Sequence, residues 1–184
     1  MRIVAGMYRG RPLVAPKGHS TRPTADRVRQ ALFNVLEHAA WAPDLDGARV
    51  IDLFAGSGAL GLEALSRGAA HCLFVDRDPA ARAAISANLA SLGCQARATV
   101  VGLDAGELGR RTEGPTFNLA FIDPPYGAGL AHPALRALSS GGWLSPGGLA
   151  VVEVGADEPR FAGPDFTPLD ARTWGAARVV FLAP

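Results

Sequence analysis

Cysteine and lysine are scarce in this chain. Two cysteines, Cys72 and Cys94, occur among 184 residues, which is too few for a disulfide framework or a cysteine-rich metal site. Both lie in apolar or helical contexts, which favours buried free thiols in a reducing, cytoplasmic compartment. Lys17 is the only lysine, so arginine carries nearly all the positive charge. No metal is expected, because no metal-ligand spacing connects the four histidines, which are His19, His38, His71 and His132.

Long hydrophobic runs are also lacking. The longest uncharged stretch, residues 137–152, is interrupted by four glycines and a proline, so it cannot form a membrane span. The first ten residues lack the apolar run of a secretory signal. The length is sufficient to bury a sizeable core. We therefore expect a compact, monomeric cytoplasmic protein without a membrane partner.

Acidic residues are scarce at the N-terminus. Residues 1–37 carry seven basic and two acidic side chains, a net charge of +5, whereas the rest carries eleven basic and fifteen acidic ones, a net charge of −4. A basic segment on an acidic body favours a polyanionic partner. The alternative is a solvated segment that binds nothing. We accordingly expect a basic extension, residues 1–40, joined to a second unit, residues 41–184.

Hydrophobic periodicity predicts an α/β fold. Short apolar runs alternate with helical segments, which indicates a mostly parallel, doubly wound sheet, and the last two runs predict an antiparallel C-terminal hairpin. A short β-hairpin (Arg2–Ala5 and Arg11–Ala15) and the amphipathic helix Ala25–Ala39, with Thr24 as its N-cap, are expected before the sheet. The other expected strands are Arg49–Phe54, His71–Asp76, Arg97–Val101, Asn118–Ile122, Leu149–Val154, Phe166–Arg172 and Ala177–Leu182, and the other helices are Ala59–Arg67, Pro79–Leu92, Ala105–Arg110 and Ala131–Ser140.

A glycine-rich turn follows the first strand of the repeat pattern. Gly56, Gly58 and Gly61 have the spacing G-x-G-x-x-G, and Asp76 follows 18 residues after Gly58. Glycine lets the backbone approach a ligand closely, and the helix N-terminus presents free N–H groups. The spacing matches a dinucleotide-binding turn. A nucleotide-containing cofactor of either kind, dinucleotide or S-adenosylmethionine, fits the motif, and a purely structural turn is the remaining alternative.

Three carboxylates lie at strand ends, and the first of them favours S-adenosylmethionine. Asp52 precedes the turn, where it would repel a pyrophosphate but can help to hold the cationic methionine end, directly or through water. Asp76 can accept hydrogen bonds from ribose hydroxyls with either cofactor. Asp104 can accept from an adenine amino group, and the alternative for it is a cap of the following helix.

The sequence Asp123-Pro124-Pro125-Tyr126 directly follows a buried strand. Its prolines remove two N–H donors and stiffen the chain, so the carbonyl oxygens stay free to accept. An aromatic amino group is a poor nucleophile, because its lone pair is delocalised into the ring. The Asp123 carboxylate and the Pro124 carbonyl can hold its two hydrogens, and Tyr126 can stack on the base. The alternative is a proline-rich strand exit with a surface tyrosine.

Together these motifs resemble the amino-group methyltransferases with a Rossmann-like class I fold. The N-terminal residues add Arg2-Ile3-Val4-Ala5-Gly6, Arg9-Gly10-Arg11, Pro16-x-Gly18 and Arg22-Pro23-Thr24-x-Asp26-Arg27-Val28-Arg29. With them the chain resembles more narrowly the RsmD family, the 16S rRNA (guanine-N2)-methyltransferases, and the resemblance runs to the final hairpin, including Glu153. One departure is Asp76-Arg77-Asp78, where relatives often have Glu-Lys-Asp, and it keeps the carboxylate. The other is Trp174-Gly175 in the last turn, where a tyrosine is common. Neither touches the proline motif.

The resemblance implies S-adenosylmethionine as the methyl donor and small-subunit ribosomal RNA as the partner, within the assembled 30S particle. It implies base contacts at Asp123, Pro124, Pro125 and Tyr126. The expected cofactor-binding residues are Asp52, Ala55, Gly56, Ser57, Gly58, Asp76, Arg77 and Asp104. The expected RNA-binding residues are Arg9, Arg11, Lys17, Arg22, Thr24, Arg27 and Arg29.

Three other functions fit part of the sequence. An adenine-N6 methyltransferase acting on DNA, RNA or free nucleotides would use the same proline motif, but DNA enzymes usually carry a recognition domain. A nicotinamide-dependent oxidoreductase explains only the glycine turn. A catalytically dead RNA-binding module is disfavoured by the intact Asp123 and Tyr126.

Overall fold

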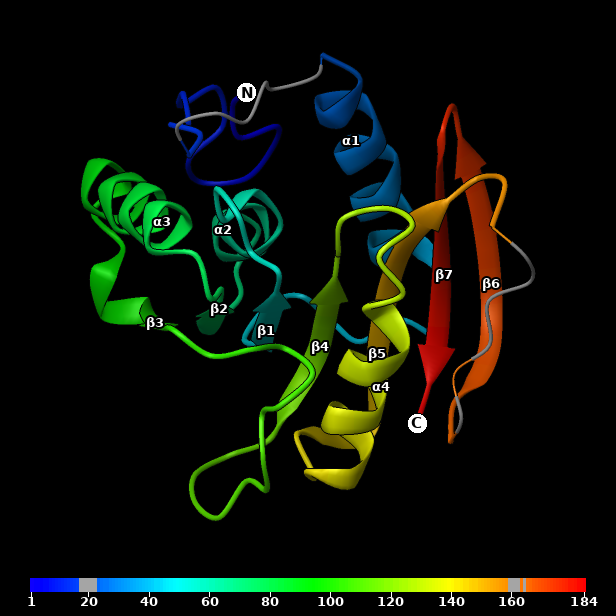
Figure 1. Ribbon diagram of the computed structural model, residues 1–184. Coiled ribbons are helices and arrows are strands. Elements are labelled where there is room, and N and C mark those ends of the chain that lie inside the picture. Colours follow the sequence, from blue (N-terminus) through cyan, green and yellow to red (C-terminus); the bar gives the residue numbers. More distant parts are fainter. Residues whose placement is uncertain (17–22, 159–162, 164) are drawn as a thin grey trace.

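A seven-stranded sheet forms the centre of the computed structural model, which describes residues 1–16, 23–158, 163 and 165–184. The strand order is β3-β2-β1-β4-β5-β7-β6; β1 to β5 are parallel, and β7 lies antiparallel between β5 and β6 (Figure 1). This confirms the expected doubly wound sheet with an antiparallel C-terminal hairpin. The strands are β1 Arg49–Leu53, β2 His71–Val75, β3 Ala98–Val101, β4 Phe117–Ile122, β5 Leu144–Gly155, β6 Thr167–Trp174 and β7 Ala177–Ala183. The helices are α1 Pro23–His38, α2 Ala59–Ser66, α3 Pro79–Leu92 and α4 Ala131–Ser140, with a 3₁₀ turn at Gln95–Arg97.

Alternate residues of the parallel strands face two hydrophobic cores, one on each side of the sheet. Val50 and Phe121 belong to the core that α1, α2 and α3 cover, whereas Ile51 and Ile122 belong to the core under α4. This burial on both faces explains why the parallel strands are almost continuously apolar. Because the strands are parallel, their carboxyl ends meet at one edge of the sheet, where ligands of this architecture bind.

Residues 1–16, called here the N-terminal arm, form a compact loop rather than two regular strands. An antiparallel bridge joins Arg2 and Pro12, and the amide of Ile3 donates to the carbonyl of Arg11 at 3.0 Å. The expected hairpin pairing is therefore present, but it is confined to this bridge. Ile3 and Leu13 are buried in the α1–α3 core, so the arm shares its hydrophobic core with the sheet.

Buried polar side chains of α2 hold the arm in place. Glu63 is fully buried and accepts from the amides of Val4 and Ala5 at 2.8 and 2.9 Å. Its charge is balanced by Arg67, whose Nε lies 2.9 Å from Oε1, and by Arg29 at 3.5 Å from Oε2. A buried carboxylate with this many partners fixes the path of the arm across α2.

Asn88 of α3 joins the arm to the glycine turn. Its Oδ1 accepts from the Val14 amide at 2.7 Å, and its Nδ2 donates to the carbonyls of Val14 and Ser57, both at 2.9 Å. Since Asn88 is buried, these bonds are shielded from water. One amide side chain thus ties the first 16 residues to the turn that follows β1.

Several expected element bounds are wrong, for local reasons. The first helix begins at Pro23, so Thr24 lies inside it and is not its N-cap. No helix forms over 105–110, because Gly106 and Gly109 interrupt it and Gly109 adopts φ +68°. β5 begins five residues earlier than expected, because the sheet accommodates the Pro146–Gly148 segment with a shift in register against β4. The sequence could not show this, since proline and glycine normally end a strand.

Both cysteines are buried free thiols, as the sequence predicts. Among the described residues, no helix is both long and apolar enough to cross a membrane. The described residues also contain no group of three or more histidine, cysteine or acidic side chains placed to hold a metal ion.

Candidate active site

The turn after β1 is built from left-handed backbone conformations. Phe54, Gly56 and Gly58 have φ values of +58°, +56° and +78°, a region that side chains other than glycine rarely occupy. A Cβ placed on Gly56 would meet only the Phe54 carbonyl oxygen, at 3.8 Å. The space beside the turn is therefore open to a ligand, and Gly58 directly precedes α2.

The third glycine of the motif has a packing role. A Cβ on Gly61 would lie 2.4 Å from the Phe74 ring and 2.5 Å from the Cys72 sulfur. Gly61 thus lets α2 pack closely on β2, which fixes the start of the helix beside the turn.

We expect Gly61→Ala to lower the free energy of unfolding by about 1–3 kcal/mol, because the inserted methyl group overpacks a buried contact. Urea titration of the purified variant measures the loss. Gly93→Ala is the comparison variant, since a Cβ there meets nothing within 4 Å and its loss would come only from the positive φ of +69°. A Gly61→Ala protein as stable as the wild type would contradict the packing role of Gly61, because alanine without a clash is favoured over glycine in a helix.

Asp52 is a buried carboxylate beside the turn. Its side chain is 1% exposed, and its Oδ2 accepts from the Gly61 amide at 2.9 Å. Burial raises the pKa of Asp52 to about 8; the Gly61 hydrogen bond opposes the shift, and the nearby charge of Asp76 adds to it. Within the described part of the chain no arginine or lysine forms an ion pair with Asp52. The residues present therefore fit a cationic ligand group, which would stabilise the ionised carboxylate.

Asp76 and Asp104 lie after the neighbouring strands β2 and β3. Asp76 accepts from the Gly56 amide at 2.8 Å through Oδ2 and from the Asp78 amide at 2.9 Å through Oδ1, so it shapes the glycine turn from the side. Asp104 accepts from the Gly106 amide at 2.9 Å. This is the backbone-capping role that the sequence offered as the alternative to adenine binding, although Asp104 caps a turn and not a helix. Arg77 is exposed and pairs with Asp104 at 3.2 Å.

The Asp123–Tyr126 segment begins where β4 ends, next to the same turn. Leu53 of β1 pairs with Ile122 of β4, and the Asp123 amide donates to the Leu53 carbonyl at 3.5 Å, a long and weak bond. The structure therefore brings the proline motif and the glycine turn together. Asp123 is half-buried, Pro124 is buried, and Pro125 and Tyr126 are exposed.

Glu153 completes this cluster from the neighbouring strand β5. The Tyr126 hydroxyl donates to Glu153 Oε1. Burial, followed by the charges of Glu153 and Asp52, raises the pKa of Asp123 well above its ordinary value. Burial also raises the pKa of Glu153, and the Tyr126 hydrogen bond opposes that shift. The sequence pointed to Glu153 only through the family resemblance, although a lone carboxylate in a buried apolar strand is itself a signal.

The expected RNA-binding residues divide into three groups. Arg9 and Arg27 are exposed, and Arg11 is exposed but donates to the Ser91 carbonyl at 2.6 Å. Arg29 is 3% exposed, and its position corrects the expectation that it tracks phosphates. Its guanidinium donates to the Arg2 carbonyl, pairs with Asp26 at 3.0 Å and approaches Glu63, so it is a structural residue. Lys17, Arg22 and the side chain of Thr24 lie outside the described residues.

This sheet order, with a glycine turn after β1, an acidic residue near the end of β1 and further acidic residues after β2 and β4, defines a class I methyltransferase fold. Residues 1–183 match the family described as conserved hypothetical protein 95. The chain belongs to this family, the RsmD family.

Named relatives agree with the assignment to this family. The chain is 36% identical over 177 residues to ribosomal RNA small subunit methyltransferase D of Haemophilus influenzae, which covers 95% of this chain and 89% of that protein. It is 42% identical over 153 residues to the protein of the same name from Escherichia coli strain K12, covering 83% and 74%. A solved structure described as putative methyltransferase yhhF from Escherichia coli has a TM-score of 0.82 at 34% identity, covering 99% of this chain and 96% of that one.

Proposed function

We propose that this protein transfers a methyl group from S-adenosylmethionine to the exocyclic N2 amino group of a guanine in small-subunit ribosomal RNA. The observation that carries the proposal is the position of Asp123 beside the glycine turn, where its amide donates to the carbonyl of Leu53 at the end of β1. Membership of the RsmD family and the names of the relatives support ribosomal RNA as the substrate. We further propose that the protein acts in the cytoplasm as a monomer, that its substrate is the assembled small subunit, and that residues 1–40 are its RNA-contacting extension.

Different residues around the turn would bind different parts of the cofactor. Asp52 would balance the positive charge of the methionine part, Asp76 would meet the ribose, and Asp104, with Arg77, would lie toward the adenine. Ala55, Gly56, Ser57 and Gly58 would contribute backbone contacts. When bound, S-adenosylmethionine supplies an electrophilic methyl group on a sulfonium, and its sulfur leaves as a neutral thioether.

Asp123 and Pro124 would act on the nitrogen of the base. The Asp123 carboxylate and the Pro124 carbonyl accept the two amino hydrogens, which favours a tetrahedral nitrogen with an available lone pair. As the nitrogen–carbon bond forms, the nitrogen becomes positively charged and must lose one proton. The ionised Asp123 carboxylate, whose pKa is raised, is the adjacent acceptor for that proton. Tyr126 stacks on the base, and its hydroxyl is held by Glu153.

Tyr126 should act mainly through its ring. We expect Tyr126→Phe to lower kcat by less than about tenfold and Tyr126→Ala by about tenfold to a hundredfold, since base stacking contributes roughly 1–3 kcal/mol. Steady-state methyl transfer to unmethylated small subunits measures both variants. If phenylalanine were as damaging as alanine, the hydrogen bond to Glu153 and not the ring would be the important contact.

One experiment tests the proposed function directly. The purified protein is incubated with radiolabelled S-adenosylmethionine and, in separate reactions, unmethylated small subunits, naked ribosomal RNA and duplex DNA. Nuclease digestion and mass spectrometry then identify the modified base. N2-methylguanine from small subunits supports the proposal, whereas N6-methyladenine or labelled DNA would replace it with the corresponding alternative.

A further inference from the structure

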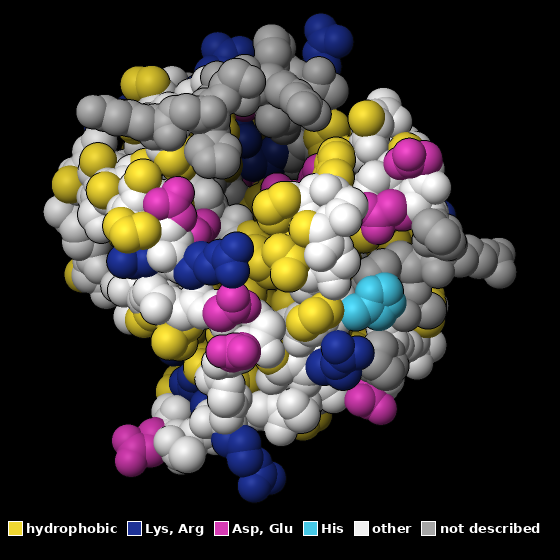
Figure 2. Space-filling view, viewed as in Figure 1, with side chains coloured by type: hydrophobic (Ala, Val, Ile, Leu, Met, Phe, Trp, Pro, Cys, Tyr) yellow, Lys and Arg dark blue, Asp and Glu magenta, His cyan; other side chains and the backbone are white. Residues whose placement is uncertain are grey.

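A cleft of about 450 Å³ lies between the N-terminal arm and α1. Figure 2 shows the molecule hollowed there, with basic side chains inside the hollow. The volume falls in the range of small-ligand pockets. Neither the glycine turn nor the Asp123–Tyr126 segment is among the described residues that line it. The cleft is therefore built from a different set of side chains than the candidate active site.

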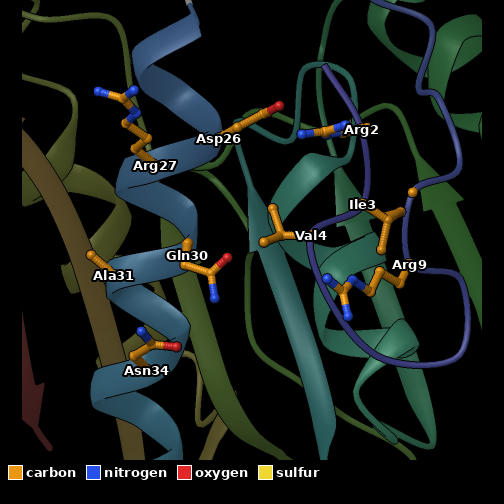
Figure 3. A pocket seen from close by; sticks show the side chains of 10 residues that line it. Arg2, Ile3, Val4, Arg9, Asp26, Arg27, Gln30, Ala31 and Asn34 are labelled. Atoms are coloured by element: carbon orange, nitrogen blue, oxygen red, sulfur yellow. The ribbon is translucent and has the colours of Figure 1, made fainter.

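Two elements face each other across this cleft (Figure 3). From the arm, Arg2 and Arg9 extend toward α1. From α1, Gln30 extends toward the arm, and Asn34 follows it one helical turn later. Arg27 also lines the cleft, but it extends on the other side of α1. The two walls thus present different chemistry: guanidinium groups on one and carboxamides on the other.

These side chains have no partner within the described part of the chain. Arg2, Arg9, Gln30 and Asn34 are exposed, and among the described residues none of their side chains forms a hydrogen bond or ion pair. Asp26 also lines the cleft, but its charge is balanced by Arg29 at 3.0 Å. The positive charge of the arm is consequently available to an anion.

We propose that the cleft binds one nucleotide of single-stranded RNA that neighbours the target base. Arg2 and Arg9 bind its phosphate, since a guanidinium fork matches phosphate geometry. Gln30 and Asn34 read its base, because a carboxamide offers a donor and an acceptor to a base edge. The inference rests on the proposed function and adds to it a subsite that supplies sequence preference.

Binding of fluorescein-labelled hexamers of rA, rC, rG and rU to the full-length protein tests the phosphate contacts. We expect Arg2→Gln and Arg9→Gln each to reduce the slope of log affinity against log salt by about 0.7, and to weaken all four hexamers alike. Arg136→Gln is the matched control, an exposed arginine on α4 outside the cleft. Unchanged slopes in both arm variants, with thermal unfolding midpoints like that of the wild type, would overturn the proposal.

The carboxamides of Gln30 and Asn34 should affect the preference among the four hexamers but not the salt dependence of binding. The wild type should prefer one hexamer, and Gln30→Ala or Asn34→Ala should reduce that preference about tenfold with an unchanged salt slope. Gln95→Ala, at an exposed glutamine in the 3₁₀ turn, is the control. Equal wild-type affinities for the four hexamers would overturn base reading. In a second measurement, 4-thiouridine in the rU hexamer should crosslink to the arm or to α1, and crosslinks confined to other elements would overturn the site.

Methyl transfer separates this inference from the proposed function. If the wild type methylates small subunits and the four cleft variants retain the wild-type KM, the proposed function stands and the subsite is wrong. If the hexamer results hold but no guanine is methylated, the subsite stands and the proposed function is wrong.

Discussion

Replacing Asp123 with asparagine is expected to slow methyl transfer about a thousandfold while leaving the affinity for S-adenosylmethionine nearly unchanged. Loss of a positioned proton acceptor typically costs a factor of 10²–10⁴. Asparagine keeps one carbonyl acceptor and the shape of the side chain, but it cannot take the proton that the nitrogen releases. Single-turnover transfer to small subunits measures the rate, and isothermal titration calorimetry measures cofactor binding.

Glu107→Gln is the matched control, since Glu107 is an exposed carboxylate whose charge the structure places outside the Asp123–Glu153 cluster. If cofactor affinity fell in parallel with the rate, Asp123 would belong to the cofactor site and not to the base.

A second test of Asp123 comes from the pH dependence of the rate. Because the pKa of Asp123 is raised, the wild-type rate should fall as the pH drops through that raised value, and the residual rate of Asp123→Asn should not follow the same profile.

Asp52→Asn is expected to remove a pH dependence of stability. The folded pKa of Asp52 is about 8, against an ordinary value of 3.8. At a pH between these two pKa values, Asp52 is protonated in the folded state and ionised in the unfolded state. The free energy of unfolding therefore falls as the pH rises across this window, by up to about 1.4 kcal/mol per pH unit.

Denaturant titrations of the cofactor-free protein at several pH values measure this effect. Asp123 and Glu153 also have raised pKa values and act in the same direction, so the informative quantity is the difference between wild type and Asp52→Asn. The free energy of unfolding of the wild type relative to that of Asp52→Asn should fall steadily as the pH rises toward 8. A constant difference would show that Asp52 titrates near its ordinary value in the folded protein.

The same carboxylate should link cofactor binding to proton release. A cationic ligand favours ionised Asp52, so the affinity for S-adenosylmethionine should rise up to about tenfold per pH unit below 8 and then level off. Calorimetry in buffers of different ionisation enthalpy counts the released protons. In Asp52→Asn the affinity should be weaker and independent of pH over this range, and persistent proton release in that variant would contradict the assignment.

The sequence was most informative where local chemistry and periodicity agree. The strand Arg49–Leu53, the glycine turn and the helix Pro79–Leu92 were predicted well, because buried parallel strands are continuously apolar and glycine and proline mark the turns and helix starts. The proximity of Asp123 to the turn was also predictable, since adjacent parallel strands end at the same edge. The start of β5 was missed because a shift in register lets a proline and two glycines remain in the strand.

Buried ion pairs were beyond the reach of the sequence. Arg29 stands in a basic stretch and was grouped with the surface arginines, yet it is buried between Asp26, Glu63 and the backbone of the arm. Its spacing did offer a signal, because Arg29 lies on the helix face of the buried Leu32, Phe33 and Leu36, whereas Arg27 is exposed on another face. Its partner Glu63 could not be predicted, since the packing of α1 against α2 is a long-range property. The same holds for the interaction of Glu63 with amides 58 and 59 residues away.

The anchoring of the arm by Glu63 and Asn88 sets an order of events during synthesis. These anchors lie 58 to 74 residues after the amides they hold, and a chain emerges from the ribosome N-terminus first. The basic arm is thus made before α2 and α3 and waits, without its docking surface, until they have emerged. During that interval the nascent arm is exposed beside a particle built largely of RNA, the polyanion that the proposed function assigns to its arginines.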